Sequence, residues 1–363
     1  MNIGIPRERR SFEYRVGLHP SGVKMLTQRG HICYVEHDAG SGAGFSDFEY
    51  QQAGAHVVYS PQEVFGRADL LLKVSRPLLE EIEWLRDGVS IAGLLHLGSS
   101  RQEKIEKLLE KDVTAIAYEQ ITLPDGTVPV RKPLSVIGGT LAAQFGARLL
   151  QNIEGGKGIL LSGCPGVPPA EVVILGAGIS GTSATQAFMG MGAHVTVMDT
   201  NLNALEIIIE KCHSITTMVS NTVNIENACS FADIIVGAVL VPGERTPIIL
   251  TREMLRTMKP RTIVMDISID EGGCIETSRL TTLEKPTFLE EGIIHFCVPN
   301  ISSAVSRTST YAYLNAAFPY ILELVEKGIE ETITTNPAIE HGVGTHQGKI
   351  RHISNLTSFA ETD

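Results

Sequence analysis

The amino-acid sequence, 363 residues long, predicts an α/β protein with parallel sheets and helices on both faces of each sheet. Short apolar segments with the character of strands alternate along the chain with segments of helical character, which is typical of parallel sheets. In addition, the segment VILGAGISG, residues 173–181, places glycines at a turn from a strand into a helix. The chain is long enough for two such domains, each with its own core.

The first unit is expected to run to about residue 130. Its strands are short and apolar, and its helices carry a charged face or end at a glycine. The expected elements are a strand at 1–8, a helix at 21–30, strands at 31–37, 68–77 and 89–98, a helix at 103–112 and a strand at 113–119.

A second domain is expected after LPDGTVPVRKPLS, residues 123–135, because proline and turn residues are typical of a crossing between domains. The tail from Asn336 onward is polar and is expected to contain little secondary structure. The expected elements are a helix at 137–151, a loop at 163–170, strands at 171–176, 194–199, 232–241, 262–270 and 293–299, and a long helix at 311–328 that returns to the first domain.

Composition excludes several classes of partner and site. A formal net charge of −11 makes nucleic acid and anionic membrane surfaces improbable general partners. The uncharged segment 172–198 contains five glycines and reads as a buried strand and helix rather than a membrane span. The N-terminus lacks the apolar core of a signal peptide, so a soluble, cytoplasmic protein is expected. The six cysteines are expected to be reduced and mostly buried, and no histidine spacing predicts a metal.

The glycine segment predicts a dinucleotide-binding, Rossmann-like domain. Gly176 permits the tight turn, Gly178 allows the backbone to approach a pyrophosphate, and Gly181 allows the helix to pack closely on the strand. A second strand, HVTVMD, ends in Asp199, which is placed to accept hydrogen bonds from the adenosine ribose. Asp199 would repel a 2′-phosphate and no arginine follows at once, so the pattern favours NAD over NADP.

Charged and titratable residues stand at the ends of several expected strands. His96 follows an apolar strand, Lys73 lies in a buried one, Arg15 follows the first strand, and Asp266 and Asp270 follow another beside two glycines. Ligands gather at the carboxyl ends of strands in open α/β sheets. Arg15 and Lys73 supply a carboxylate clamp, His96 a group that titrates near neutral pH, and Asp270 a carboxylate. Together they suit hydride transfer on a small keto or amino acid.

The sequence resembles the alanine dehydrogenase and proton-translocating transhydrogenase superfamily, and within it the alanine dehydrogenases. The resemblance covers nearly the whole chain, and its motifs stand in the family's order: GIPRE, EYRVGLHPSGV, ADLLLKVSRP, LLHLGSS, AIAYE, PGVPPAEVVILGAGISG, ADIIVGAVLVPG, DISIDEGGC and TSTYAYLNAAFPY. It implies two Rossmann-like domains with an active-site cleft between them: a split substrate domain, residues 1–128 plus 307–363, and an NAD-binding domain, residues 129–306. It also implies a homo-oligomer, a hexamer.

The resemblance further implies the reversible oxidative deamination of L-alanine to pyruvate and ammonium, with hydride transfer to NAD. Arg15 and Lys73 would bind the substrate carboxylate and keto oxygen. His96 would act as general acid and base on the oxygen, and Asp270 would orient or activate water or ammonia at the imine carbon.

The cofactor residues are also implied by the resemblance. Ser135 would lie near the phosphates, Leu240 and Ile267 near the nicotinamide, and Asn300 near its amide. The full implied set is Ser135, Gly176, Gly178, Ile179, Gly181, Asp199, Val239, Leu240, Ile267 and Asn300.

The segment LSVIGGT, residues 134–140, departs from the family pattern. Where the family commonly has an acid and an arginine, this chain has Val136 and Thr140, while Ser135 is kept. The loss of an ion pair between two such positions costs only ~0–1 kcal/mol, so the fold should survive.

Three alternatives stay open at this point. The chain could be the soluble NAD(H)-binding subunit of a transhydrogenase, although the resemblance suggests that such subunits lack the His96 equivalent. It could be a non-catalytic NAD-binding homologue, with LSVIGGT as the trace of lost activity. It could also apply the same chemistry to a different small amino acid.

Overall fold

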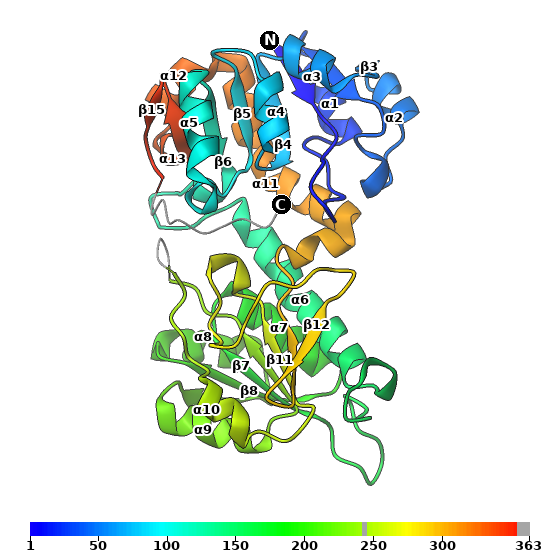
Figure 1. The fold of residues 1–363 in the computed structure, drawn as a ribbon, viewed down its shortest axis with the longest axis vertical. Helices are drawn as coiled ribbons and strands as arrows, with labels where there is room; N and C mark the ends of the chain where they lie inside the picture. The colour runs from blue at the N-terminus through cyan, green and yellow to red at the C-terminus, as the bar shows by residue number, and fades with distance from the viewer. Residues whose placement is uncertain (242–244, 354–363) are drawn as a thin grey trace. The chain divides into compact units, whose positions relative to one another are not determined.

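The computed structural model describes residues 1–241 and 245–353. The chain divides into two compact units: Met1–Leu134 together with the chain from Ser303 onward, and Ser135–Ser302. Each unit holds one sheet of mostly parallel strands with helices packed against it (Figure 1). The predicted α/β fold class is confirmed. The units divide at 134/135 and 302/303, whereas the resemblance implies boundaries at 128/129 and 306/307.

The first unit contains an eight-stranded sheet. Its strands are β1 (Asn2–Ile5), β2 (Ile32–Glu36), β3 (His56–Val58), β4 (Leu70–Ser75), β5 (Ser90–Leu94), β6 (Thr114–Ala117), β14 (Val343–His346) and β15 (Lys349–Ile350). Their order across the sheet is β15-β14-β6-β5-β4-β1-β2-β3. The strands from β6 to β3 run parallel, and β14 is antiparallel to both of its neighbours.

Helices cover both faces of the first sheet. They are α1 (Pro20–Thr27), α2 (Asp47–Gln52), α3 (Pro61–Arg67), α4 (Leu79–Trp84), α5 (Gln102–Glu110), α11 (Ser306–Lys327), α12 (Ile329–Thr335) and α13 (Pro337–His341). Figure 1 shows α3, α4 and α5 along one face, where Phe65, Ile82 and Leu108 join one apolar cluster. A second cluster includes Leu26 from α1 and Tyr313 from α11. The long C-terminal helix thus returns to the first unit, as predicted.

The second unit contains a seven-stranded sheet in the order β12-β13-β11-β10-β7-β8-β9. Its strands are β7 (Glu171–Leu175), β8 (His194–Asp199), β9 (Thr216–Val219), β10 (Ile234–Gly237), β11 (Ile263–Asp266), β12 (Thr287–Glu290) and β13 (Ile293–Phe296). All neighbours are parallel except β12 and β13, which are antiparallel. Its helices are α7 (Ile179–Gly190), α8 (Leu202–Lys211), α9 (Thr222–Phe231) and α10 (Arg252–Thr257), and α6 (Arg131–Leu149) enters it from the first unit.

The expectation of an unstructured tail from Asn336 was wrong. The Asn336 side chain accepts hydrogen bonds from the backbone of Ala338 and Ile339, which starts α13. The following strand β14 then pairs with β6, and all four of its residues are buried. Polar residues such as Thr345 tolerate this burial because they are hydrogen-bonded, in this case to the carbonyl of Val113. The strand β12 was also not expected.

Two other predictions concern burial. The uncharged segment 172–198 forms β7, α7 and β8, and none of the described helices is long and apolar enough to span a membrane. Five of the six cysteines are buried, Cys164 is exposed, and all six are free thiols. Both readings of the sequence are therefore confirmed.

Candidate active site

The glycine turn of the second unit has the features of a pyrophosphate cradle. It joins β7 to α7, and Gly176 has φ +107°, a backbone conformation that glycine adopts readily. A Cβ atom at Gly181 would overlap the carbonyl oxygen of Gly176. Gly178 is the N-cap residue of α7, and with no side chain it accepts no capping hydrogen bond from the first turn of that helix. The backbone N–H groups of the turn are thus suited to an anion.

Asp199 lies at the end of β8, as predicted, and also holds the glycine turn. Its Oδ2 accepts a hydrogen bond of 2.7 Å from the backbone N–H of Ala177, and its Oδ1 accepts one of 2.8 Å from Asn201. Each carboxylate oxygen can accept a further bond. The sequence predicted a ribose-binding role and gave no sign of the bond to Ala177, which fixes the shape of the glycine turn.

Helix α6 packs directly on this cradle. A Cβ atom at Gly139 would overlap the carbonyl oxygen of Ser180. The departure in LSVIGGT lies on the same helix: Val136 is 41 % exposed, and the Thr140 hydroxyl donates a hydrogen bond of 2.9 Å to the carbonyl of Val136. The two positions are one helical turn apart, so an acid and an arginine there would be spaced as an ion pair.

Three further loops of the second unit follow neighbouring strands. Val239, after β10, donates its N–H to the Ser268 hydroxyl at 2.9 Å, and Ile267, after β11, donates to the carbonyl of Gly237 at 3.0 Å. The Asp270 carboxylate accepts the N–H of Asn300, after β13, at 3.1 and 3.2 Å. The structure thus links predicted residues 239, 267, 270 and 300 through short loop contacts. Leu240, beside Val239, is 45 % exposed.

The loop that carries Asp270 is held by Asp266. This buried carboxylate accepts hydrogen bonds from the N–H groups of Ser268, Cys274 and Ile275 and from the Ser278 hydroxyl. Burial raises the pKa of Asp266, although these hydrogen bonds favour its charged form. Asp266 therefore organises the loop, while Asp270 is exposed at its surface.

His96 follows β5 in the first unit, in a left-handed conformation with φ 42°. The buried carboxylate of Glu119 accepts hydrogen bonds from the N–H groups of Leu95 and His96 at 3.1 and 2.6 Å. Sequence reasoning missed Glu119, although it ends the AIAYE motif. Its two bonds fix the strand end that presents the histidine.

Positive charge surrounds the His96 ring. Arg76 donates hydrogen bonds to the carbonyl of His96 at 3.4 Å and to the Ser99 hydroxyl at 2.8 Å. The surrounding protein atoms lower the pKa of His96, and the charges of Arg76, Arg131, Arg15 and Arg10 lower it further. The residue is nevertheless exposed to solvent, so a small molecule can reach it. His96 is therefore a neutral imidazole near pH 7, able to accept a proton.

The predicted carboxylate clamp consists of two cations that are each paired with glutamates. Arg15, 3 % exposed, forms two contacts with Glu13, Nε to Oε1 at 2.7 Å and Nη2 to Oε2 at 2.6 Å. Burial alone would raise the pKa of Glu13, but the neighbouring Arg15 outweighs it and lowers that pKa. Lys73 is fully buried, and its Nζ lies 2.8 Å from Glu81 and 3.3 Å from Glu8. The sequence required a partner for Lys73 but did not identify these two.

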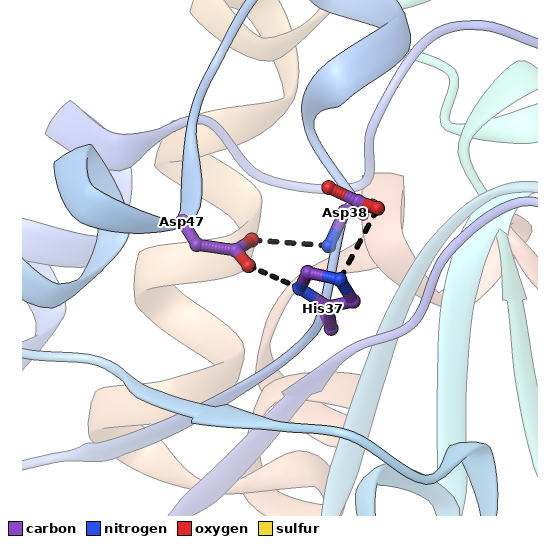
Figure 2. A group of neighbouring side chains, drawn as sticks. All are labelled: His37, Asp38 and Asp47. Atoms are coloured by element: carbon purple, nitrogen blue, oxygen red, sulfur yellow. Dashed lines mark hydrogen bonds and ion pairs between the residues drawn. The ribbon is translucent and has the colours of Figure 1, made fainter.

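A separate surface cluster, His37, Asp38 and Asp47, brings three possible metal ligands together (Figure 2). The ring Nδ1 contacts the Asp47 carboxylate, and Nε2 lies 3.3 Å from Asp38. The contact with Asp47 raises the pKa of His37, and the charge of Asp38 raises it further. A metal ligand needs a free nitrogen lone pair, whereas each nitrogen here faces its own carboxylate. The geometry is that of a histidine paired with two acids.

Comparison with known proteins places these features in one family. The model of the alanine dehydrogenase/PNT N-terminal domain matches residues 4–137, and that of the C-terminal domain matches residues 142–353. An alanine dehydrogenase of Methanococcus maripaludis is 42% identical over 354 residues, which are 97% of this chain and 95% of that protein. An alanine dehydrogenase of Mycobacterium tuberculosis is 42% identical over 351 residues, or 96% and 94% of the two chains.

Solved structures agree with the sequence comparisons. An L-alanine dehydrogenase structure is similar with a TM-score of 0.93 and 39% identity, and 97% of each chain is covered. A transhydrogenase structure from Sinorhizobium meliloti has a TM-score of 0.81 at 23% identity, covering 97% of this chain and 99% of that one. The second likeness concerns the fold alone.

Proposed function

Because this chain belongs to the alanine dehydrogenase/PNT family, we propose that it is an NAD-dependent L-alanine dehydrogenase. The reaction is the reversible deamination of L-alanine to pyruvate and ammonium. The observation that carries the proposal is the neutral, solvent-exposed His96 surrounded by four arginine charges. A substrate carboxylate is attracted to such a site, and in the deamination direction the substrate meets a base that is free to accept a proton.

The residues of the second unit fit NAD. At Gly181 a Cβ atom would overlap the backbone of the glycine turn, so only glycine fits there. Helix α7 begins without a side-chain cap, and Asp199 supplies a carboxylate at the end of β8. The turn from Gly176 to Gly181 would hold the pyrophosphate, and Asp199 would bind the ribose hydroxyls. The remaining cofactor contacts are assigned to Ser135, Ile179, Val239, Leu240, Ile267 and Asn300. When bound, NAD supplies the acceptor for the hydride that leaves the substrate Cα.

The chemistry on the substrate is assigned to residues of both units. Arg15 and Lys73 bind the carboxylate and the oxygen that becomes the keto group. The amino group reacts as the neutral amine, whose lone pair forms the C=N bond of an iminium as the hydride leaves. Asp270 orients water for attack at the iminium carbon, and one proton of that water passes to the nitrogen. His96 takes the proton of the resulting hydroxyl group as ammonia leaves, which forms pyruvate. In the reverse direction His96 donates that proton.

Substrate charge is expected to change the protonation of His96 during the cycle. The arginine charges that keep the ring neutral are offset when the substrate carboxylate binds beside them. The protonated ring is then less disfavoured, so the same histidine can hold the proton that it has accepted. This coupling lets one residue act as base in deamination and as acid in the amination of pyruvate.

We also propose an assembly and a location. The family resemblance leads us to propose a homohexamer, which light scattering of the purified protein would measure. We propose a cytoplasmic enzyme, and fractionation of cells from the source organism would test this. The proposal includes no nucleic-acid or membrane partner, in keeping with the net charge of −11.

The first test is NADH oxidation with pyruvate and ammonium at mildly alkaline pH. The proposal requires that oxidation depend on both compounds. Oxidation that needs only a second nicotinamide, supplied as a thio-analogue of NAD, would instead identify a transhydrogenase subunit. NADH binding without turnover on any keto acid would identify a non-catalytic homologue. A clearly higher kcat/KM with glyoxylate, 2-oxobutyrate or a bulkier keto acid would contradict alanine as the substrate.

A further inference from the structure

The fully buried Lys73 has two glutamate partners that differ in how firmly they are held. Oε1 of Glu81 accepts a hydrogen bond of 2.8 Å from the Lys73 ammonium, and Oε2 accepts one of 2.8 Å from the backbone N–H of Leu78. Both of its oxygens are therefore used in good hydrogen bonds, and the side chain is 1 % exposed. The second bond lies at the start of α4, so Glu81 is a fixed part of the fold.

Glu8 is held by only one of its oxygens. Oε1 accepts the N–H of Val74 at 2.7 Å. Oε2 lies 3.3 Å from the Lys73 ammonium, is buried, and accepts no hydrogen bond of good geometry from the described residues. Leaving a buried acceptor unsatisfied is unfavourable. The contact between Glu8 and Lys73 is thus the weaker and more exchangeable of the two.

An ammonium group has three donors. One of them donates a hydrogen bond to Glu81, and Glu8 lies close enough to block access to another. Lys73 is fully buried, so a substrate can bind its ammonium only if a present neighbour moves or gives way. Among the two partners, Glu8 is the one that can be replaced without disturbing the start of α4.

We infer that Glu8 is a positioning residue that holds the Lys73 ammonium in the empty enzyme and is replaced there by the substrate carboxylate. This rests on the proposed function, in which Lys73 binds substrate. Two carboxylates that compete for one ammonium exclude each other when both are ionised. Protonation of Glu8 removes the competition. Substrate binding is therefore coupled to the uptake of a proton by Glu8.

The charges that face Glu8 come from several elements. Lys73 lies on β4, Glu81 on α4, Glu13 and Arg15 on the loop after β1, and Tyr313 on α11. Burial raises the pKa of Glu8 to about 7, although the charge of Lys73 lowers it. Proton uptake by Glu8 is therefore expected near neutral pH, where the enzyme can be assayed.

The test uses oxamate, an unreactive compound shaped like pyruvate, as a competitive inhibitor of the full-length enzyme with NADH present. Its dissociation constant from the enzyme–NADH complex is measured by titration from pH 6 to pH 8.5 without ammonium, so that the titration of ammonia does not enter. For the wild type, the constant should increase about tenfold between pH 6 and pH 8, since binding needs protonated Glu8. Glu8→Gln should bind oxamate tightly with little change over the same range.

Two matched variants separate Glu8 from other buried carboxyls. Burial also raises the pKa of Glu119 to about 7, so Glu119→Gln tests whether that group causes the pH dependence. Glu36→Gln removes a carboxylate of the neighbouring network, where Glu36 is paired with Arg9 and the backbone of Arg7. Both variants should keep the pH dependence of the wild type. NADH affinity and thermal unfolding monitor the fold of each protein.

The outcomes are distinct. A pH dependence that persists in Glu8→Gln, or that disappears in Glu119→Gln, would overturn the role of Glu8. Uniformly weaker oxamate binding in Glu8→Gln with an unchanged slope would also overturn it, because a merely structural role predicts that result. A wild type that turns over pyruvate but binds oxamate equally well at every pH would contradict this inference alone. No turnover and no oxamate binding in the wild type would overturn the proposed function with it.

Discussion

The two units prepare their parts of the proposed site by different physical means. In the first unit the candidate residues are charged side chains, and Arg15 and Lys73 are compensated by the buried glutamates Glu13, Glu8 and Glu81. In the second unit the cofactor cradle consists mainly of backbone, with glycines at the close contacts and one carboxylate, Asp199, that fixes the turn. The charges of the first unit's candidate residues depend on pH. The glycine turn of the second unit instead depends on the absence of side-chain volume at its close contacts.

This comparison has a chemical basis. Hydride transfer and deamination require groups that change protonation, and the pKa values of such groups are set by burial, neighbouring charge and hydrogen bonds. A pyrophosphate keeps its charge throughout turnover, so fixed N–H groups suffice. Substitutions in the first unit should therefore alter rates and pH profiles, and those in the second should alter cofactor affinity.

Removal of the catalytic groups should give the largest effect. His96→Ala and Asp270→Asn are each expected to lower kcat by about 10²- to 10⁴-fold, because both groups act in the transition state. NADH affinity, measured by fluorescence titration, should stay close to that of the wild type. A substantial residual kcat in both variants would contradict their assigned roles.

A single methyl group in the cradle should have the next largest effect. Gly181→Ala places a Cβ atom on the carbonyl oxygen of Gly176, so we expect NADH binding to be lost or weakened severely. Gly190→Ala lies in the same helix, and its Cβ would meet no atom of the described residues within 4 Å outside its own stretch of helix, so it should stabilise the protein by up to about 1 kcal/mol. Titration with NADH and thermal unfolding check both. Equal NADH affinity in the two variants would refute the role of the turn from Gly176 to Gly181 in binding NADH.

Cofactor preference should change more moderately. Asp199→Ala removes the acceptor proposed for the ribose and the bond to the N–H of Ala177. We expect a higher KM for NADH and better tolerance of NADPH, since the repulsion of a 2′-phosphate is lost. Steady-state kinetics with both cofactors measure this. An unchanged ratio of the two kcat/KM values would show that Asp199 does not bind the ribose.

The smallest expected effect is a shift of a pH profile. Arg76 is one of the charges that lower the pKa of His96, and its removal in Arg76→Ala should raise that pKa toward its ordinary value. With L-alanine and NAD as substrates, where His96 acts as the base, the acidic limb of log(kcat/KM) against pH should therefore move to higher pH. Arg67→Ala, on the exposed face of α3, serves as the control and should leave the limb in place. A limb that does not move in Arg76→Ala would mean that its charge does not act on His96.

The sequence predicted the local structure of the segments that carry the candidate residues. The glycine turn, its strand and helix, and Asp199 lie within one short segment, so their spacing alone defines the geometry. The positions of His96 and Asp270, in the loops that follow β5 and β11, were predicted in the same way. Each of these features depends on steric rules that act over a few residues.

The partners of the charged residues were not predictable in the same way. Glu8 and Lys73 are far apart along the chain, and they meet only because β1 pairs with β4. The tail beyond Asn336 was misread for a related reason, since the burial of β14 comes from its pairing with the distant β6. Polarity within one segment does not reveal such long-range contacts.

The most direct test of the account is the fate of the hydrogen on the substrate Cα. L-Alanine carrying deuterium at Cα is incubated with the enzyme and NAD, and the reduced cofactor is analysed by mass spectrometry. The account predicts one deuterium in NADH for each pyruvate formed. Pyruvate formed without deuterium in NADH, or no reaction at all while NAD still binds, would contradict it.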